Sequence, residues 1–228
     1  MADTQNRLLL PLLLSFTAGY VDTAGFLALQ GLFTAHVTGN FVTLGAALAL
    51  GASGVLAKLL ALPVFCAVVV AVRLLATVMS RRWRPVFEVL LGLKMLLLAI
   101  GGALALRFGP FHDGDSWQAI LTGMVLVAAM AIQNAIHRLY LGSAPPSTLM
   151  TGTTTQIMLD IADVILPGDA KGQTRARLGR MSVNVLVFAL GCGIAALLFV
   201  HFGVWCLALP PVLAGASLLV RIVGPSDD

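Results

Sequence analysis

Residues 181–202 read MSVNVLVFALGCGIAALLFVHF, a stretch without a single Asp, Glu, Lys or Arg. A helix needs about 20 apolar residues, at about 1.5 Å each, to cross a hydrocarbon layer about 30 Å thick. This stretch is long enough to do so, and several others along the chain meet the same requirement. The sequence therefore predicts an all-α integral membrane protein, with the lipid bilayer as its surroundings.

The composition of the whole chain agrees with a lipid environment. Of its 228 residues, 59% are apolar and 11% are charged, and the mean hydropathy is +0.97. One soluble core of this size cannot bury so much apolar surface. The apolar run from Leu8 contains Asp22 and has no clear small-residue cleavage site. We therefore expect a retained span there rather than a secretory signal.

Motifs of other protein classes are missing from the sequence. The formal net charge is +4, but the basic residues form short clusters between apolar runs, a pattern typical of topology signals and not of nucleic-acid binding. The motifs G-x-x-x-x-G-K-[ST], H-E-x-x-H and G-x-S-x-G do not occur. Cys66, Cys192 and Cys206 are isolated in apolar stretches, which favours neither a disulfide framework nor a zinc site. We expect no enzyme activity, catalytic residue, metal or cofactor, and a membrane-embedded enzyme acting on lipid stays open as a rival class.

The chain divides into long apolar segments and two shorter ones. Six segments are long enough to be transmembrane helices, at about 8–30, 57–79, 85–107, 117–140, 181–202 and 204–222. The two shorter segments, 33–51 and 147–166, are polar where they begin. The first begins with His36, Thr38, Gly39 and Asn40, and the second with Thr148, Thr151, Gly152, Thr153 and Gln156.

Two basic clusters predict the topology. The positive-inside rule places Arg81, Arg82 and Arg84 in the cytoplasm, together with Lys171, Arg175, Arg177 and Arg180. Both clusters can be cytoplasmic only if segments 33–51 and 147–166 enter the membrane and return, or break, without crossing. We therefore expect six spans and two re-entrant or broken segments, with both termini cytoplasmic.

An internal repeat accompanies this topology. Residues 38–40 align with 151–153 at an offset of 113, and one residue of slippage places Asp22 opposite Asn134. Each half, about 8–107 and 117–222, contains three crossings, so the second half must be inverted relative to the first. We expect two inverted three-span repeats within one domain, 1–228. Convergence of two threonine-glycine segments is the alternative.

Four short motifs resemble one family. They are Gly19-Tyr20-Val21-Asp22, His36-Val37-Thr38-Gly39-Asn40, Gln133-Asn134-Ala135 and Thr148-Leu149-Met150-Thr151-Gly152. In this combination and spacing they resemble the YoaK-like family of uncharacterised multi-span membrane proteins, over nearly the whole chain. The resemblance implies a bacterial inner-membrane protein of this length, and it implies no particular activity.

Two ionisable residues lie deep in expected spans. Asp22 is about 14 residues, or about 21 Å, from the inner boundary, where a carboxylate costs about 2.5 to 3.5 kcal/mol and marks a functional site by default. Its alternative role is structural, as a cap of a broken helix or a partner of Tyr20 or a threonine. Lys94 is about nine residues into its span, and we expect it to pair with Asp22 or Glu88 or to contact substrate.

The starts of the two short segments are the other candidate sites. Thr38-Gly39-Asn40 and Thr151-Gly152-Thr153 begin helices whose first N–H groups lack partners, and these groups attract anions or polar ligands. Glycine allows close backbone approach. The alternative is that these residues only cap and pack the helices. His36 could relay protons, or be a satisfied polar contact in a loop.

Paired polar breaks at membrane depth predict a cavity, because irregular backbone is stable there only beside protein or water. We expect Asp22, Thr38, Asn40 and Thr151 to line it together, and we expect a secondary transporter or permease for a small solute or ion. An ion channel and a non-transporting scaffold or sensor remain as alternatives. Substrate, coupling ion, direction and any homo-oligomer are left open by the sequence.

Overall fold

The computed structural model describes residues 2–80, 85–166 and 171–224. In these ranges the chain is helical and contains no strand. The helices are α1 (Ala2–Ala28), η1 (Val37–Gly39), α2 (Asn40–Leu50), α3 (Val55–Ser80), α4 (Val86–Phe108), α5 (Trp117–Tyr140), α6 (Met150–Ile165), α7 (Lys171–Phe202), η2 (Gly203–Ala208) and α8 (Leu209–Val223). Arg81, Arg82 and Arg84 of the first basic cluster lie outside the described residues.

Five helical stretches of the described chain are long and apolar enough to cross a membrane. The last of them, Gly172–Val223, contains both C-terminal segments that the sequence separates at residue 203. α7 begins at Lys171 rather than at 181, because the basic residues before 181 are good helix formers. α8 begins at Leu209 rather than at 204, and Pro210 and Pro211 occupy its first turn, where a missing N–H is tolerated.

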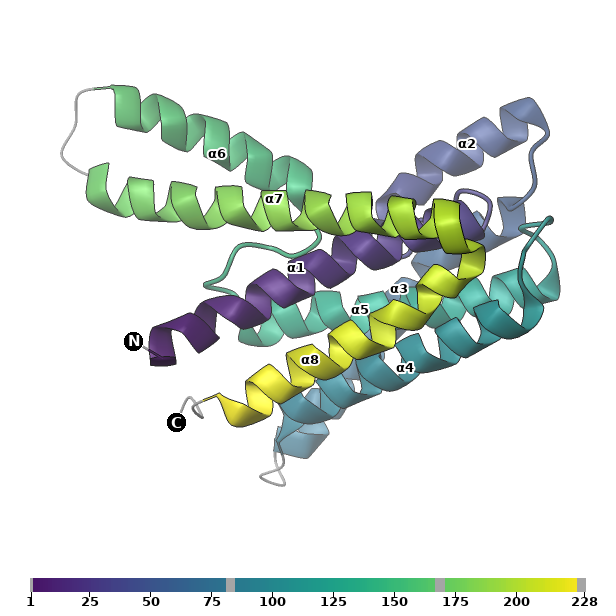
Figure 1. Ribbon diagram of the computed structural model, residues 1–228, viewed down its shortest axis with the longest axis horizontal. Coiled ribbons are helices and arrows are strands. Elements are labelled where there is room, and N and C mark those ends of the chain that lie inside the picture. The colour runs from purple at the N-terminus through teal and green to yellow at the C-terminus, as the bar shows by residue number, and fades with distance from the viewer. Residues whose placement is uncertain (1, 81–84, 167–170, 225–228) are drawn as a thin grey trace.

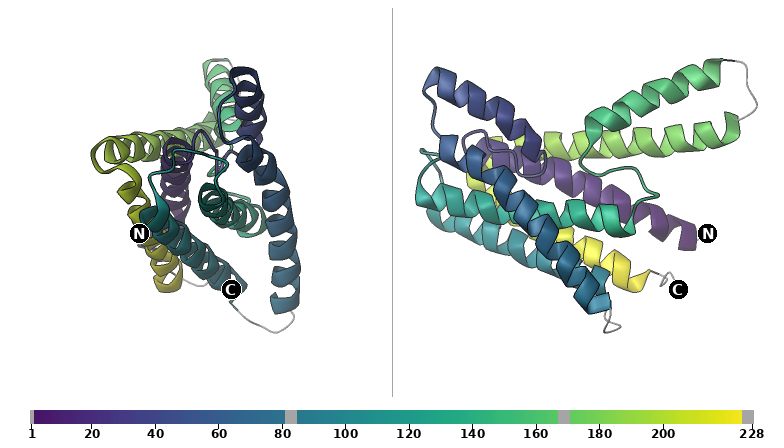
Figure 2. Two further views of the ribbon diagram at one scale, coloured as in Figure 1. Left: turned by 90° about the vertical axis from the view of Figure 1, so that its right-hand side faces the viewer. Right: turned by 180° about the vertical axis from the view of Figure 1, so that it is seen from behind.

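The long helices pack into one bundle. α1 lies against α7, α5 lies against α3 and α4, and α8 lies against α4 and α1. The α1–α7 contact is close because Gly19 and Gly191 face the other helix: a Cβ at either would collide with a carbonyl oxygen, of Phe188 and Phe16 respectively. Figures 1 and 2 show α2 and α6 over the same side of the bundle, at its opposite ends.

Each short helix is reached by a segment that runs back along the preceding long helix. After α1 the chain reverses at Gln30 and Gly31, whose φ angles are 54° and 82°, a region in which glycine is unstrained. α2 then leads outward again, and α3 runs the length of the bundle (Figure 1). The segment after α5 also runs back, and α6 then leads to the end where α7 begins (Figure 1).

The two ends of the bundle carry different parts of the chain. One end holds the start of α1 and the end of α8 (Figure 1). The end of α3, the start of α4, the end of α6 and the start of α7 lie at the same end. The opposite end holds the α4–α5 connection and η2. These placements set the candidate site between two returning segments, one from each half of the chain.

Candidate functional site

Asp22 closes the turn that follows α1. Its side chain is 6% exposed. Oδ1 accepts hydrogen bonds from the backbone N–H groups of Thr34 and Ala35, each at 2.7 Å, and Oδ2 accepts one from His36 N–H at 3.3 Å. These three N–H groups precede η1 and have no helical carbonyl to bond, so the carboxylate satisfies them. Asp22 therefore holds the loop before η1, and its partners include the Thr34 hydroxyl, which donates to Oδ1 at 3.4 Å. Tyr20 instead donates its hydroxyl to the Cys206 carbonyl at 2.8 Å.

Asn134 makes a corresponding contact in α5. Its Oδ1 accepts a hydrogen bond from the Thr148 hydroxyl at 2.6 Å, and its Nδ2 donates to the Met130 carbonyl at 3.0 Å. Asp22 precedes the end of α1, and Asn134 the end of α5, by six residues each. Both side chains thus hold a segment that has returned about 9 Å along its own helix.

Buried amides fix the second returning segment. Gln133 donates from Nε2 to the Leu14 carbonyl at 2.8 Å and to the Ser147 hydroxyl at 3.1 Å. Asn184 of α7 donates to the Pro146 carbonyl at 2.8 Å and accepts from the Ser15 hydroxyl at 2.5 Å. Sequence reasoning missed Asn184, although an amide inside the apolar stretch 181–202 was a usable signal.

Asn40 binds the backbone of its own loop. Its Oδ1 accepts from Phe33 N–H at 2.9 Å and its Nδ2 donates to the Phe33 carbonyl at 2.8 Å. Gly39 lies beneath the rings of Phe33 and His36, and a Cβ there would approach each to 3.0 Å. Thr38 is exposed. Of this triplet, Gly39 and Asn40 therefore shape the loop.

The second triplet divides in the same way. Thr151 and Gly152 are exposed at the start of α6, and a Cβ on Gly152 would meet no atom within 4 Å. Thr153 is buried and donates its hydroxyl to the Leu149 carbonyl at 2.8 Å. No close approach requires glycine at position 152.

Lys94 lies inside the bundle without the expected partner. It is completely buried, and its Nζ has no hydrogen-bond partner among the described atoms. The expected pairing with Asp22 or Glu88 is wrong: Asp22 binds backbone N–H groups, and Glu88 accepts from Arg221 Nε at 2.9 Å. Pairing depends on which helix faces lie together, and Lys94 occupies a different face from both carboxylates.

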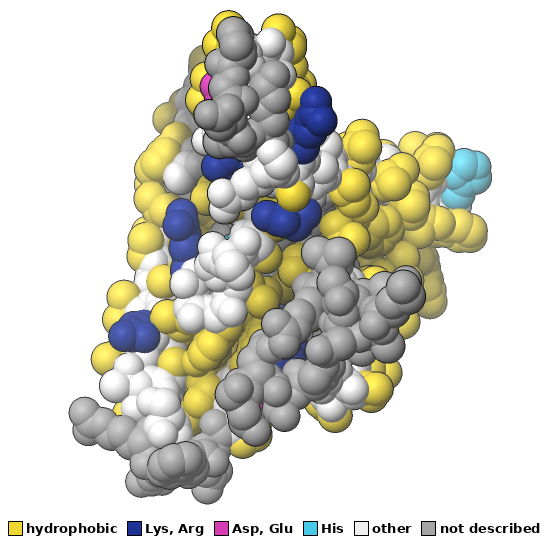
Figure 3. Space-filling model, turned by 90° about the vertical axis from the view of Figure 1, so that its left-hand side faces the viewer, with side chains coloured by type: hydrophobic (Ala, Val, Ile, Leu, Met, Phe, Trp, Pro, Cys, Tyr) yellow, Lys and Arg dark blue, Asp and Glu magenta, His cyan; other side chains and the backbone are white. Residues whose placement is uncertain are grey.

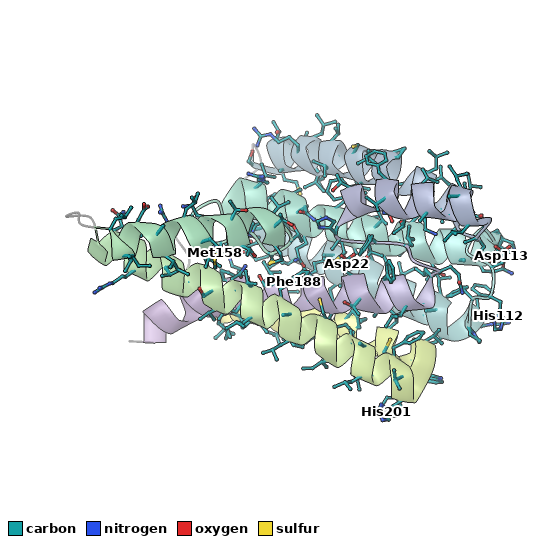
Figure 4. All side chains as sticks on the ribbon, turned by 90° about the horizontal axis from the view of Figure 1, so that it is seen from above. Asp22, His112, Asp113, Met158, Phe188 and His201 are labelled. Carbon is teal, nitrogen blue, oxygen red and sulfur yellow. The ribbon has the colours of Figure 1, made fainter. Side chains whose placement is uncertain are left out.

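One cavity, which we call the Asp22 cavity, joins the two halves of the chain. Its volume is about 310 Å³. It is lined by Asp22, Thr23, Phe26, Leu27, Phe33, His36, Thr148, Met150, Phe188 and Cys192. Figure 4 shows Asp22 and Phe188 near the middle of the molecule. The cavity brings Asp22 together with His36 and Thr148, and not with Thr38, Asn40 or Thr151 as expected, because Asn40 turns to Phe33 and the two threonines point outward.

A second cavity, the arginine cavity, lies on the other side of Thr148. Its volume is about 250 Å³. Its polar lining residues are Asn134, His137, Arg138, Ser143, Thr148, Arg177 and Arg180. Thr148 lines both cavities. Sequence reasoning treated Arg177 and Arg180 only as topology signals. No group of three His, Cys, Asp or Glu side chains in the described ranges is arranged to hold a metal ion.

Comparisons with known proteins place most of the chain in one group. The family model described as "Protein of unknown function (DUF1275)" matches residues 10–220. The "UPF0700 transmembrane protein YoaK" of Bacillus subtilis (strain 168) is 30% identical over 202 residues, which cover 85% of each chain. No solved structure matches the chain. The expected resemblance to a YoaK-like membrane family is confirmed.

Proposed function

The chain belongs to the DUF1275 family of membrane proteins, and from this premise we propose that it is a permease that carries a small solute across the bilayer. The Asp22 cavity is the observation that carries the proposal. Residues of both halves line it, at the point where two non-helical segments meet. Irregular backbone at membrane depth is stable beside protein or a water-filled cavity, and paired helix breaks form the substrate site in many secondary transporters.

The proposal includes a topology of six spans. α1, α3, α4, α5, α7 and α8 cross the membrane, with η2 extending α8. α2 has 11 residues and α6 has 16, which gives lengths of about 16 Å and about 24 Å, both short of the roughly 30 Å hydrocarbon layer. These two helices enter and return.

The two halves are inverted copies in this proposal. In this inverted repeat, α1 corresponds to α5, α2 to α6, α3 to α7 and α4 to α8. Three observations support it: α1 packs on α7 as α5 packs on α3, α4 packs on α5 as α8 packs on α1, and Asp22 and Asn134 bind equivalent returning segments. Such inversion lets one half rock against the other around a fixed site.

The lining indicates the kind of solute. Phe26, Leu27, Phe33 and Phe188 make most of the wall apolar, while His36 and Thr148 supply polar atoms. A cavity of about 310 Å³ is at the small end of ligand sites. We therefore infer a small amphipathic solute, with one polar end and an apolar body, that reaches the cytoplasm past Thr148.

Uptake into proteoliposomes tests the proposal. The purified full chain would be offered radiolabelled amino acids, short carboxylates and nucleosides, one at a time. We expect saturable uptake of at least one class, and at least a tenfold loss with Phe188→Trp, which fills the cavity. The control is Leu190→Trp, because Leu190 lies on the same helix and is 60% exposed.

The outcomes separate the rival functions. Uptake that stays linear with concentration and carries current would replace the permease with a channel. No uptake of any class, from protein shown to be folded by its elution and thermal midpoint, would reject transport and favour a scaffold or sensor.

A further inference from the structure

The arginine cavity collects cationic groups from two helices. Arg138 comes from α5, and Arg177 and Arg180 come from α7. Arg177 binds Asp160 through Nε at 2.8 Å and Nη2 at 2.5 Å, which fixes its guanidinium. Arg138 and Arg180 are exposed and form no ion pair within the described part of the chain. Figure 3 shows basic side chains gathered on this end of the molecule.

A buried nitrogen without a partner belongs to one residue of the same lining. His137 is 7% exposed and lines the cavity. Its Nε2 lies 3.2 Å from the Ala144 carbonyl, but its Nδ1 has no hydrogen-bond partner among the described atoms. Buried polar atoms in native proteins are nearly always satisfied, so an unsatisfied one beside a cavity indicates a missing ligand or water.

The start of α6 lies beside the arginine cavity. Leu149, the residue before α6, lines the cavity. The N–H groups of a helix's first turn have no intrahelical acceptor and carry partial positive charge. Three guanidinium groups line the cavity, while the carboxylates of Asp160 and Asp163 act on Arg177 from outside the lining, so the lining itself is positively charged.

We propose that the arginine cavity binds a small oxyanion, a phosphate or carboxylate group. Guanidinium forks match both groups with two parallel hydrogen bonds. The volume of about 250 Å³ fits a small molecule or a headgroup rather than a large ligand. This inference rests on the proposed function, because it assigns the polar end of the transported solute as an anion that passes through the arginine cavity.

Topology alone does not require this arrangement. The positive-inside rule needs basic residues anywhere on the cytoplasmic side, and Arg175 satisfies it from an exposed position that does not line the cavity. Convergence of Arg138, Arg177 and Arg180 on one space is a separate property, and it makes Arg175 a suitable control.

Direct binding to the full chain in a neutral detergent tests the site. The probes are ³²P-orthophosphate and ¹⁴C-succinate, measured at equilibrium and rising salt. We expect saturable binding of at least one probe that weakens with salt, because exposed charges are screened. Arg138→Gln with Arg180→Gln should weaken it at least tenfold, and Arg175→Gln with Arg107→Gln, an equal loss of charge, by less than twofold. If the double variant does not fold, each single substitution replaces it.

A lipid arm distinguishes the source of the oxyanion. Nanodiscs of phosphatidylcholine would be compared with nanodiscs that also contain phosphatidylglycerol. Loss of probe binding in the anionic discs, dependent on Arg138 and Arg180, supports the site and identifies a headgroup as its occupant. Unchanged binding supports a soluble anion.

Two results would overturn the inference: no saturable binding of either probe in detergent or nanodiscs, or equal weakening by both double variants. Failure of the permease proposal is distinguishable. Binding that persists without any uptake rejects transport alone, and uptake blocked by Phe188→Trp without oxyanion binding rejects the site alone.

Discussion

Polar side chains at membrane depth bind the protein's own backbone. Asp22, Asn40 and Asn134 each bond a segment that lacks regular hydrogen-bond partners. The sequence identified these residues, because polar groups inside apolar runs are rare. It did not identify their partners, which are loop N–H groups and hydroxyls 7 to 14 residues away. These side chains therefore stabilise the returning segments. Asp22 also lines the Asp22 cavity, and Asn134 lines the arginine cavity.

Replacement of Asp22 by Asn should destabilise the protein. The amide keeps one acceptor but turns an NH₂ group toward an N–H donor and removes the charge from two short hydrogen bonds. We expect a loss of about 1 to 3 kcal/mol in the free energy of unfolding, measured by steric trapping in bicelles. Asp113→Asn, at an exposed position in the α4–α5 connection, serves as the control and should change it by less than about 0.5 kcal/mol. Equal stability of both variants would contradict the role of Asp22 in holding the loop before η1.

The two buried lysines should respond with opposite signs. Lys94 has no partner for its Nζ, so Lys94→Met removes an uncompensated polar group and should stabilise the fold by about 1 kcal/mol or more. Lys58 donates to the Gln30 carbonyl at 2.8 Å and the Ser53 carbonyl at 3.2 Å. Lys58→Met should therefore destabilise it by about 1 to 3 kcal/mol. Thermal midpoints in detergent give both signs, and destabilisation by Lys94→Met would indicate an unseen partner for its amine.

The start of α3 is capped by a residue distant in sequence. α3 begins at Val55, and Asp115, in the loop before α5, accepts hydrogen bonds from Gly54, Val55, Leu56 and Ala57 N–H at 2.8 to 3.2 Å. No local sequence pattern predicts such a cap. The start of α5 is capped locally instead, by Ser116, which sequence rules do anticipate.

Loss of the Asp115 cap should loosen the first turn of α3. Asp115→Ala removes the acceptor of four N–H groups and the favourable charge at a helix start, so we expect a loss of about 1 to 2 kcal/mol. Hydrogen exchange of residues 54–57 should accelerate more than exchange at the centre of α3. His112→Ala, at an exposed position in the same loop, is the control, because the carboxylate of Asp113 accepts a hydrogen bond from Asp115 N–H. Equal exchange in both variants would refute the cap.

The whole molecule places the start of α1, the end of α8 and the start of α7 at one end, with the α4–α5 connection at the other (Figure 1). The charge of the loops and this arrangement lead to the same proposed orientation. The native thiols do not obscure a labelling test, since Cys66, Cys192 and Cys206 all lie within apolar segments.

Cysteine accessibility should reveal this orientation. A membrane-impermeant thiol reagent should label His112→Cys in intact cells, because that position is exposed in the α4–α5 connection. It should label Gln173→Cys only after permeabilisation, because the proposed topology puts the start of α7 on the cytoplasmic side. Labelling of Gln173→Cys in intact cells would reject both the topology and the inverted halves.

A feature of this protein could be predicted from the sequence when it depends on residues that are close together in the chain. Helical structure, membrane location and the family follow from runs of adjacent residues and short motifs. Asp22 and Asn134 were identified because their cost is local, whereas the pairing of Lys94 was predicted wrongly because it depends on helix facing. The expected single cavity with Thr38, Asn40 and Thr151 failed for the same reason: one helical turn decides whether a side chain points inward.

The sequence by itself determined that this is an all-helical membrane protein with two polar breaks, because transfer into lipid is a sum over consecutive side chains. Only the tertiary structure decided what meets at those breaks. It put His36 and Thr148 beside Asp22 and assembled Arg138, Arg177 and Arg180 around one space. The physical reason is that cavities form between helices distant in sequence, whose contacts depend on packing angles that no local pattern encodes.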